Sequence, residues 1–198
     1  MRETFRVAVV DDDDSVRDGA ILVLSGLDHE AQGFTSGDHF LKDGADEAWS
    51  AVFLDLKMPG RTGLEVLQEL QARYQTLPYP VLMISAHGDI QVAVQAMRLG
   101  ASSFIEKPFT ADQLTDAVRD VAAPQSDVDT HGDLLAELTP REREVADLLI
   151  EGLSNKEVGR ALDCSPRTIE IHRARVLKKL GVRNVAGLVR LMVSATSA

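Results

Sequence analysis

The stretch Val7-Ala8-Val9-Val10-Asp11-Asp12-Asp13-Asp14 decides the fold, because four apolar residues lead directly into four carboxylates. Three further apolar runs also stop at polar side chains: two end on Asp55 and Ser85, and the third lies just before Lys107. Short runs of this kind are typical of strands that are buried on both faces of a parallel sheet. In an open parallel sheet, functional groups collect in the crevice beyond the carboxyl ends of the strands. We therefore expect carboxylates, a hydroxyl and an ammonium to surround one point at that edge.

Strand-like and helix-like patterns alternate over about the first 123 residues. Amphipathic helical patterns fill the gaps between the expected strands, and a last helix is predicted at about 110–122. The expected strands lie near residues 6–10, 30–34, 51–54, 80–84 and 102–105. Five strand–helix units of this size predict an α/β doubly wound five-stranded parallel sheet of the flavodoxin-like kind, in a first domain of residues 1–122.

A second domain, residues 138–198, is predicted to be all-α, with four helices. Residues 123–137, which precede it, are polar, contain proline and glycine, and are typical of a linker. Two capping boxes begin helices at Thr139-Pro140-Arg141-Glu142 and at Ser154-Asn155-Lys156-Glu157. The tight turn at Asp163-Cys164 predicts a helix-turn-helix.

Boundary signals also mark the third and fourth helices of this domain. Ser165-Pro166 begins a third helix, which is expected to run to Lys179 or Leu180, and Asn184 can cap a fourth.

Charge is distributed unevenly along a chain whose net charge is −10. Residues 1–123 carry a net charge of −10, whereas residues 138–198 carry +4, which indicates two modules with different partners. The single cysteine, Cys164, excludes an internal disulfide and fits a reducing compartment. No apolar stretch approaches the ~20 residues of a membrane span, and the N-terminus has no signal-peptide core. We expect a cytoplasmic protein with no membrane partner.

Asp11, Asp12 and Asp55 are the candidate metal ligands. Three carboxylates within a few ångströms are costly unless a cation neutralises them, and hard oxygen ligands favour Mg²⁺. Asp55 can then act as a nucleophile toward an anionic phosphate. Lys107 can bind a phosphoryl oxygen and Ser85 can donate a hydrogen bond to another. Asp13 and Asp14 are better interpreted as residues that begin a helix.

The first domain resembles the receiver domain of two-component response regulators. The motifs that carry the resemblance are Val10-Asp11-Asp12, Asp55-Leu56-Lys57-Met58-Pro59-Gly60, Ser85-Ala86-His87-Gly88 and Lys107-Pro108-Phe109. The resemblance implies that a sensor histidine kinase phosphorylates Asp55 and that the Lys57 backbone carbonyl is a further metal ligand. It also implies that Ser85 is the switch hydroxyl, Phe104 the switch aromatic and Lys107 the phosphate-contacting lysine. A cis peptide is expected between Lys107 and Pro108.

The second domain resembles the DNA-binding domain of LuxR-type regulators, in the FixJ/NarL family. The matching segments are residues 138–145, 152–158, 165–173 and 179–183. A helix-turn-helix sets its second helix in the major groove, where Glu170, Ile171 and Arg173 would reach base edges. Basic and hydroxyl side chains are expected to contact phosphates; they are Lys156, Thr168, Arg175, Lys178 and Lys179.

The combined hypothesis is a phosphorylation-dependent transcriptional regulator rather than an enzyme with turnover on an external substrate. Its expected partners are a sensor histidine kinase, double-stranded promoter DNA and a second copy of the chain when phosphorylated, with RNA polymerase as a further candidate. Two other classes stay open from the residues alone. One is a phosphatase with an aspartate nucleophile, although such enzymes carry a second acid where this chain has Lys57. The other is a receiver whose helical domain is a protein-binding adaptor.

Overall fold

The computed structural model describes residues 4–86, 90–122, 137–182 and 185–196. The chain divides into two compact units, the first within residues 1–87 and 99–124 and the second within residues 88–98 and 125–198. The helix α4 (Ile90–Arg98) belongs to the second unit in this division. The predicted linker, residues 123–137, lies outside the described residues except for Glu137.

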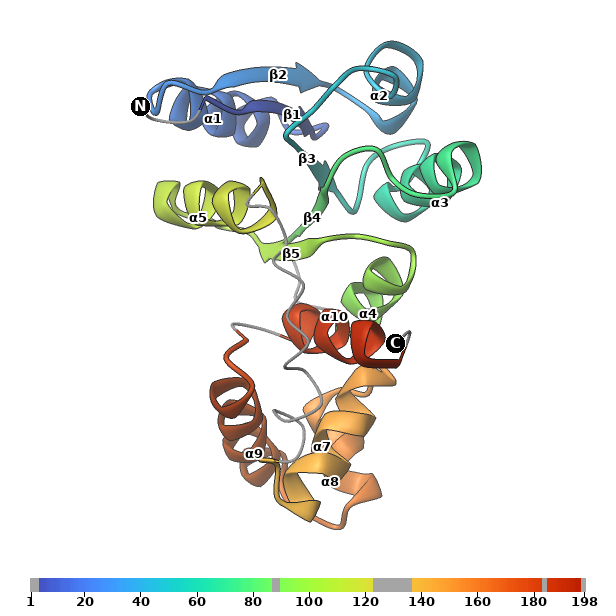
Figure 1. Cartoon of the computed structure of the whole chain (residues 1–198), viewed down its shortest axis with the longest axis vertical. Helices are drawn as coiled ribbons and strands as arrows, with labels where there is room; N and C mark the ends of the chain where they lie inside the picture. Colours follow the sequence, from blue (N-terminus) through green and yellow to red (C-terminus); the bar gives the residue numbers. More distant parts are fainter. Residues whose placement is uncertain (1–3, 87–89, 123–136, 183–184, 197–198) are drawn as a thin grey trace. The chain divides into compact units, whose positions relative to one another are not determined.

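The first unit contains a five-stranded parallel sheet with the strand order β2-β1-β3-β4-β5. Its strands are β1 (Arg6–Val10), β2 (Glu30–Phe34), β3 (Ala51–Asp55), β4 (Val81–Ser85) and β5 (Ser103–Glu106). Its helices are α1 (Asp14–Ser25), α2 (Gly37–Asp43), α3 (Gly63–Tyr74) and α5 (Ala111–Ala122). Helices α1 and α5 cover one face of the sheet, and α2 and α3 cover the other (Figure 1). The predicted doubly wound fold is confirmed.

Burial explains why the central strands have no alternating pattern. The side chains of β1 from Val7 onward, and those of β3 and β4, are almost completely shielded from solvent because helices lie on both faces. Each buried Val, Leu, Ile or Phe side chain contributes about 1.5–3 kcal/mol of transfer free energy. The strand ends are therefore rigid supports for the polar residues that follow them.

The register of the strands brings those polar residues to one edge. Val10 is paired with Leu54, so Asp11 and Asp55 come next on adjacent strands. Ser85 is paired with Glu106, which puts Lys107 just beyond the neighbouring strand end. The sequence predicts this common edge, and the register confirms it.

The second unit contains α4, α7 (Pro140–Ile150), α8 (Asn155–Ala161), α9 (Pro166–Lys179) and α10 (Val185–Thr196). Helices α7, α8 and α9 begin where the boundary signals predict, directly after Thr139, Ser154 and Ser165. Both predicted capping boxes form, at Thr139 with Glu142 and at Ser154 with Glu157. The proposed cap at Asn184 lies outside the described residues.

The helix-turn-helix is formed by α8 and α9. Asp163 takes a left-handed φ of 53°, and the Cys164 amide donates to the Gly159 carbonyl at 2.8 Å. A Cβ at Gly159 would lie 2.7 Å from the Cys164 carbonyl oxygen, so the close approach of helix and turn requires glycine there. Arg141 also donates to the carbonyl of Leu162 at 2.5 Å, which ties the start of α7 to the turn.

None of the helices in the described part of the chain has the length and apolar character that a membrane crossing requires.

Candidate functional site

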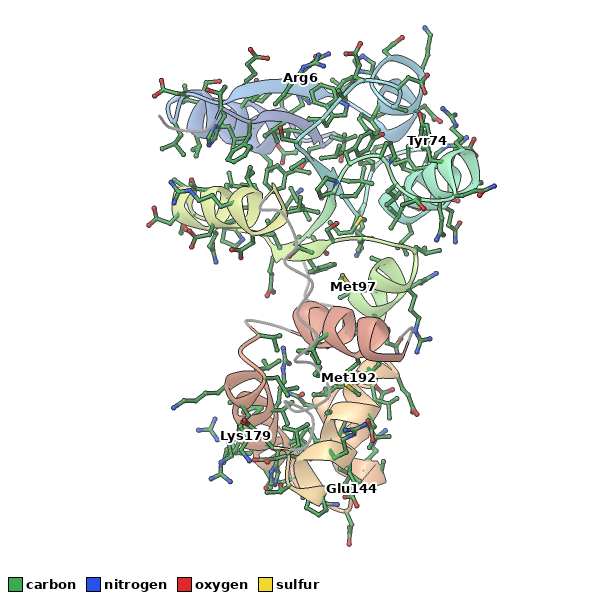
Figure 2. All side chains as sticks on the ribbon, in the orientation of Figure 1. Arg6, Tyr74, Met97, Glu144, Lys179 and Met192 are labelled. Carbon is green, nitrogen blue, oxygen red and sulfur yellow. The ribbon has the colours of Figure 1, made fainter. Side chains whose placement is uncertain are left out.

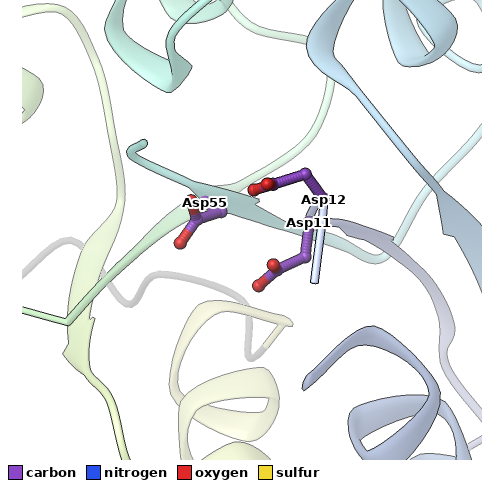
Figure 3. Close-up of side chains that lie close together, drawn as sticks. All are labelled: Asp11, Asp12 and Asp55. Atoms are coloured by element: carbon purple, nitrogen blue, oxygen red, sulfur yellow. The ribbon is translucent and has the colours of Figure 1, made fainter. Parts of the chain in front are cut away.

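Three carboxylates converge at the carboxyl edge of the sheet. Asp11, Asp12 and Asp55 can each offer one oxygen atom such that these atoms lie within 4.8 Å of one another. Figure 3 shows the three side chains gathered at the carboxyl ends of β1 and β3. Asp11 and Asp55 are buried, whereas Asp12 is exposed and open to a ligand from solvent. An all-oxygen set of this charge fits a hard divalent cation such as Mg²⁺.

A lysine ammonium bridges the two buried carboxylates. Lys107 Nζ lies 2.7 Å from Asp11 Oδ2 and 2.5 Å from Asp55 Oδ1. Burial lowers the pKa of Lys107, but the hydrogen bonds to Asp11 and Asp55 outweigh burial, so its pKa is raised overall. The lysine therefore remains charged at neutral pH and offsets part of the negative charge of the cluster.

The segment after β5 places this lysine. The peptide between Lys107 and Pro108 is cis, as the sequence analysis predicted. The Lys107 amide donates to the Ser85 carbonyl at 2.7 Å, which fastens the segment to the end of β4. Ser85 itself is buried at that strand end, and Phe104 is half-buried on β5, where it is paired with Met83.

Asp55 lies in a buried environment that shifts its pKa. Burial raises its pKa above the ordinary value, although hydrogen bonding and attraction from Lys107 oppose that rise. The amide of Lys57 also donates to Asp55 Oδ2 at 2.9 Å and favours the charged form. A divalent cation beside Asp55 would add to these effects and keep the carboxylate ionised and nucleophilic.

Two residues at this edge were missed by the sequence analysis. A Cβ at Gly63 would lie 2.2 Å from the Asp55 carbonyl oxygen, so only glycine lets α3 begin against the end of β3. Arg17 on α1 is almost fully buried, and it donates to the Asp11 carbonyl at 3.1 Å. A lone glycine and a lone arginine carry no distinctive sequence signal; the arginine's place three residues after Asp14 is the only available hint.

The predicted DNA-reading helix α9 presents a largely accessible surface. Ile171 is 48% exposed, which is unusual for a large apolar side chain, and Glu170 is also exposed. Arg173 and Thr168 are half-buried. The predicted phosphate-contacting residues that are exposed are Lys156, Arg175 and Lys178.

Lys179 differs from the other basic residues of α9. Its Nζ lies 2.7 Å from Glu142 Oε2 and also donates to the Glu137 carbonyl at 3.1 Å. Glu142 is buried on α7, and it also accepts from the Thr139 amide at 2.9 Å. The hydrogen bond from Lys179, with those from Thr139, lowers the pKa of Glu142 to about 2. Lys179, labelled in Figure 2, thus links α9 to the capping box of α7.

The fold and the site together define a class of protein. A doubly wound sheet whose carboxyl edge gathers three aspartates and one lysine has the architecture of a phosphoacceptor receiver domain. The helix-turn-helix in the same chain adds the architecture of a DNA-binding output domain.

Comparison with known proteins identifies the family. Residues 7–119 match the response regulator receiver domain, and residues 136–192 match the bacterial regulatory proteins of the luxR family. The chain therefore belongs to the response regulators that combine a receiver domain with a LuxR-type DNA-binding domain. It is a phosphorylation-dependent transcription regulator and not an enzyme with turnover on an external substrate, which removes the phosphatase alternative.

Several relatives match over nearly the whole chain. The transcriptional regulatory protein FixJ of Bradyrhizobium diazoefficiens is 38% identical, over 96% of this chain and 95% of the relative. The transcriptional regulatory protein TdiR of Thauera aromatica is 35% identical, over 96% of this chain and 86% of the relative. Among solved structures, full-length FixJ from B. japonicum is 36% identical, with a TM-score of 0.57 over 99% of this chain and 100% of that one.

Proposed function

We propose that Asp55 accepts a phosphoryl group from the phosphohistidine of a sensor kinase. The observation that carries this proposal is the convergence of Asp55 with Asp11, Asp12 and the Lys107 ammonium at one edge of the sheet. An Asp55 carboxylate oxygen attacks phosphorus, the new P–O bond forms as the P–N bond breaks, and the electron pair stays on the histidine nitrogen. The product is an aspartyl phosphate beside Lys107.

The proposed metal is Mg²⁺, held by the carboxylates of Asp11, Asp12 and Asp55 and by the Lys57 carbonyl. When bound, Mg²⁺ would neutralise the cluster and stabilise the charge on the transferring phosphoryl oxygens. Two side chains of the protein would bind the phosphoryl oxygens. Lys107 holds one phosphoryl oxygen as a point charge, and the Ser85 hydroxyl donates to another.

The proposed switch couples this site to the second domain. Ser85 and Lys107 are already joined through a backbone hydrogen bond, and Phe104 lies on β5, the strand that leads to Lys107. Movement of Ser85 toward the phosphoryl group would let Phe104 turn inward and reshape the adjacent surface. We propose that this change promotes a homodimer, because two helix-turn-helix units on a symmetric site sum their DNA contacts.

The proposed target is double-stranded promoter DNA in the cytoplasm, with RNA polymerase as a further partner. The exposed Glu170 and Ile171, with Arg173 on the same helix, are the proposed base-reading residues. Lys156, Thr168, Arg175 and Lys178 are the proposed phosphate contacts. Lys179, which the sequence pattern assigned to the same role, is already paired with Glu142, so we propose that it contributes less to DNA binding than Lys178 does.

The test of the phosphoacceptor is Asp55→Asn, which preserves shape and removes the nucleophilic charge. We expect no incorporation of labelled phosphoryl group from an acyl phosphate with Mg²⁺, and no phosphorylation-dependent gain in DNA affinity. Asp38→Asn is the matched control, because Asp38 is an aspartate of α2 that pairs with Arg61 and lies outside the carboxylate cluster. Incorporation of the labelled phosphoryl group by folded Asp55→Asn would contradict the assignment of Asp55 as the phosphoacceptor.

A further inference from the structure

Arg17 is a buried cation that lies next to the acidic cluster and has no role in the proposed phosphoryl transfer. Its side chain is only 11% exposed, and its guanidinium serves three groups. Nη1 donates to the Asp11 carbonyl at 3.1 Å, and Nη2 lies 2.6 Å from Asp14 Oδ1 and 3.6 Å from Asp18 Oδ1. An arginine with this little exposure is rare unless its donors are paired.

The neighbouring strand leaves room for this arginine. A Cβ at Gly33 of β2 would lie 3.0 Å from Arg17 Cδ, 3.2 Å from Arg17 Cγ and 2.9 Å from Ile21 Cδ1. A Cβ at Gly33 would therefore force the aliphatic part of Arg17 to shift by a few tenths of an ångström. The absence of a side chain at Gly33 thus leaves room for the aliphatic part of Arg17, while the guanidinium contacts the residue that follows β1.

The contact with Arg17 completes the restraint of Asp11. The Asp11 amide donates to the Phe34 carbonyl at 3.1 Å, and Asp11 Oδ1 accepts from the Asp13 amide at 3.0 Å. Because Arg17 occupies the Asp11 carbonyl, the amide, the carbonyl and one carboxylate oxygen are all fixed. Asp11 Oδ2 is the oxygen left to face Lys107, at 2.7 Å. Asp12 lies between Asp11 and Asp13, and the hydrogen bond from the Asp13 amide to Asp11 Oδ1 restrains the backbone on both sides of it.

We propose that Arg17 is a positioning residue for the divalent-cation site: it fixes the loop that carries Asp11 and Asp12 so that their carboxylates meet the ion together with Asp55. This inference rests on the proposed metal site. Groups that orient metal ligands without touching the ion commonly change metal affinity by about 10–100-fold when they are removed.

The sign of the effect separates positioning from simple electrostatics. Arg17 is a positive charge that neutralises Asp14 and Asp18, so its removal makes the region more negative. Electrostatics alone would then tighten the binding of a divalent cation. The positioning role predicts weaker binding, because Asp11 and Asp12 would lose their fixed geometry.

The experiment measures cation affinity in the full-length chain without any phosphorylation step. Mn²⁺ is titrated into wild type and Arg17→Met, with free Mn²⁺ followed by its electron paramagnetic resonance signal, and Mg²⁺ is titrated by calorimetry. Arg73→Met is the matched control, because Arg73 also donates to a backbone carbonyl, of Leu41 at 3.0 Å, and to a carboxylate, of Glu69 at 3.2 Å. Arg73 is on α3 and contacts none of the three candidate ligands.

We expect Arg17→Met to weaken Mn²⁺ and Mg²⁺ binding by about ten-fold and Arg73→Met to leave it unchanged. Unchanged or tighter binding by folded Arg17→Met would overturn the inference. If Arg17→Met does not fold, Arg17→Lys decides. The single ammonium of Arg17→Lys cannot contact both the Asp11 carbonyl and the Asp14 carboxylate. We therefore expect this variant to bind the cations more weakly than wild type, with a smaller loss than the roughly ten-fold loss expected for Arg17→Met. Wild-type affinity in Arg17→Lys would refute the positioning role. Lack of Mn²⁺ binding by wild type would instead refute the metal site itself, and the inference with it.

Discussion

Lys178 and Lys179 are adjacent in the sequence, but the structure predicts that they contribute differently to DNA binding. Lys178 is exposed and, within the described residues, makes no ion pair, whereas Lys179 is bound to buried Glu142 at 2.7 Å. Replacing either lysine with methionine removes one positive charge, so the long-range change in charge is the same in both variants. Any difference between them therefore reports the local contact.

The expected magnitude follows from counterion release. The loss of one phosphate contact makes the plot of log affinity against log salt concentration less steep by about 0.9. Between about 50 and 200 mM salt, that slope corresponds to a change in affinity of about 3.5-fold per contact. We expect Lys178→Met to show most of this decrease in the salt dependence of DNA affinity. We expect Lys179→Met to lose much less, because its ammonium is already neutralised by Glu142.

The assay is fluorescence anisotropy with a labelled promoter duplex over a series of salt concentrations. Urea unfolding of the same variants supplies the complementary measurement, in which Lys179→Met lowers the free energy of unfolding of the C-terminal helices and Lys178→Met does not. Equal decreases in salt slope for the two variants would refute the reasoning. So would a larger decrease for Lys179→Met in a fully folded protein.

Four further predictions follow from the same contacts. Because the pKa of Glu142 is lowered to about 2 from 4.5, its pair with Lys179 stabilises the fold above pH 4.5 and loses this effect as pH falls through about 2; urea unfolding of Glu142→Gln should show a correspondingly weaker pH dependence. Arg173→Ala should cost about 1–3 kcal/mol on the specific DNA site and less on random DNA; an equal loss on both would make Arg173 a phosphate contact. Gly63→Ala should lower the unfolding free energy by about 1–3 kcal/mol, since its Cβ would meet the Asp55 carbonyl; wild-type stability in urea would contradict this. A beryllofluoride mimic with Mg²⁺ should shift the chain from monomer toward dimer in sedimentation, and an unchanged mass at DNA-binding concentrations would argue against dimerisation.

Much of the fold could be predicted because its signals are local. The unalternating apolar runs that end at Val10 and Leu54 predict strands covered on both faces, and the structure confirms them within a residue or two. The capping boxes at Thr139 and Ser154 depend on residues three positions apart, so they can be identified without any tertiary contact. The meeting of Asp11 and Asp55 also follows from the sequence, because parallel strands share a carboxyl edge.

Other features depended on contacts between residues that are distant in the chain. The sequence gives Lys178 and Lys179 the same expected role, and only the packing of α9 against α7 pairs the second of them with Glu142. Arginine is usually an exposed residue of a helix, and only the tertiary structure shows that Arg17 is buried, with its aliphatic part close to Gly33 of a neighbouring strand. Sequence periodicity determines which face of an element is buried, whereas the partner of an individual charge is fixed by the tertiary packing. For this reason the sequence alone determined the fold and the cluster of acids, and the tertiary structure decided which carboxylate or carbonyl group each buried basic side chain contacts.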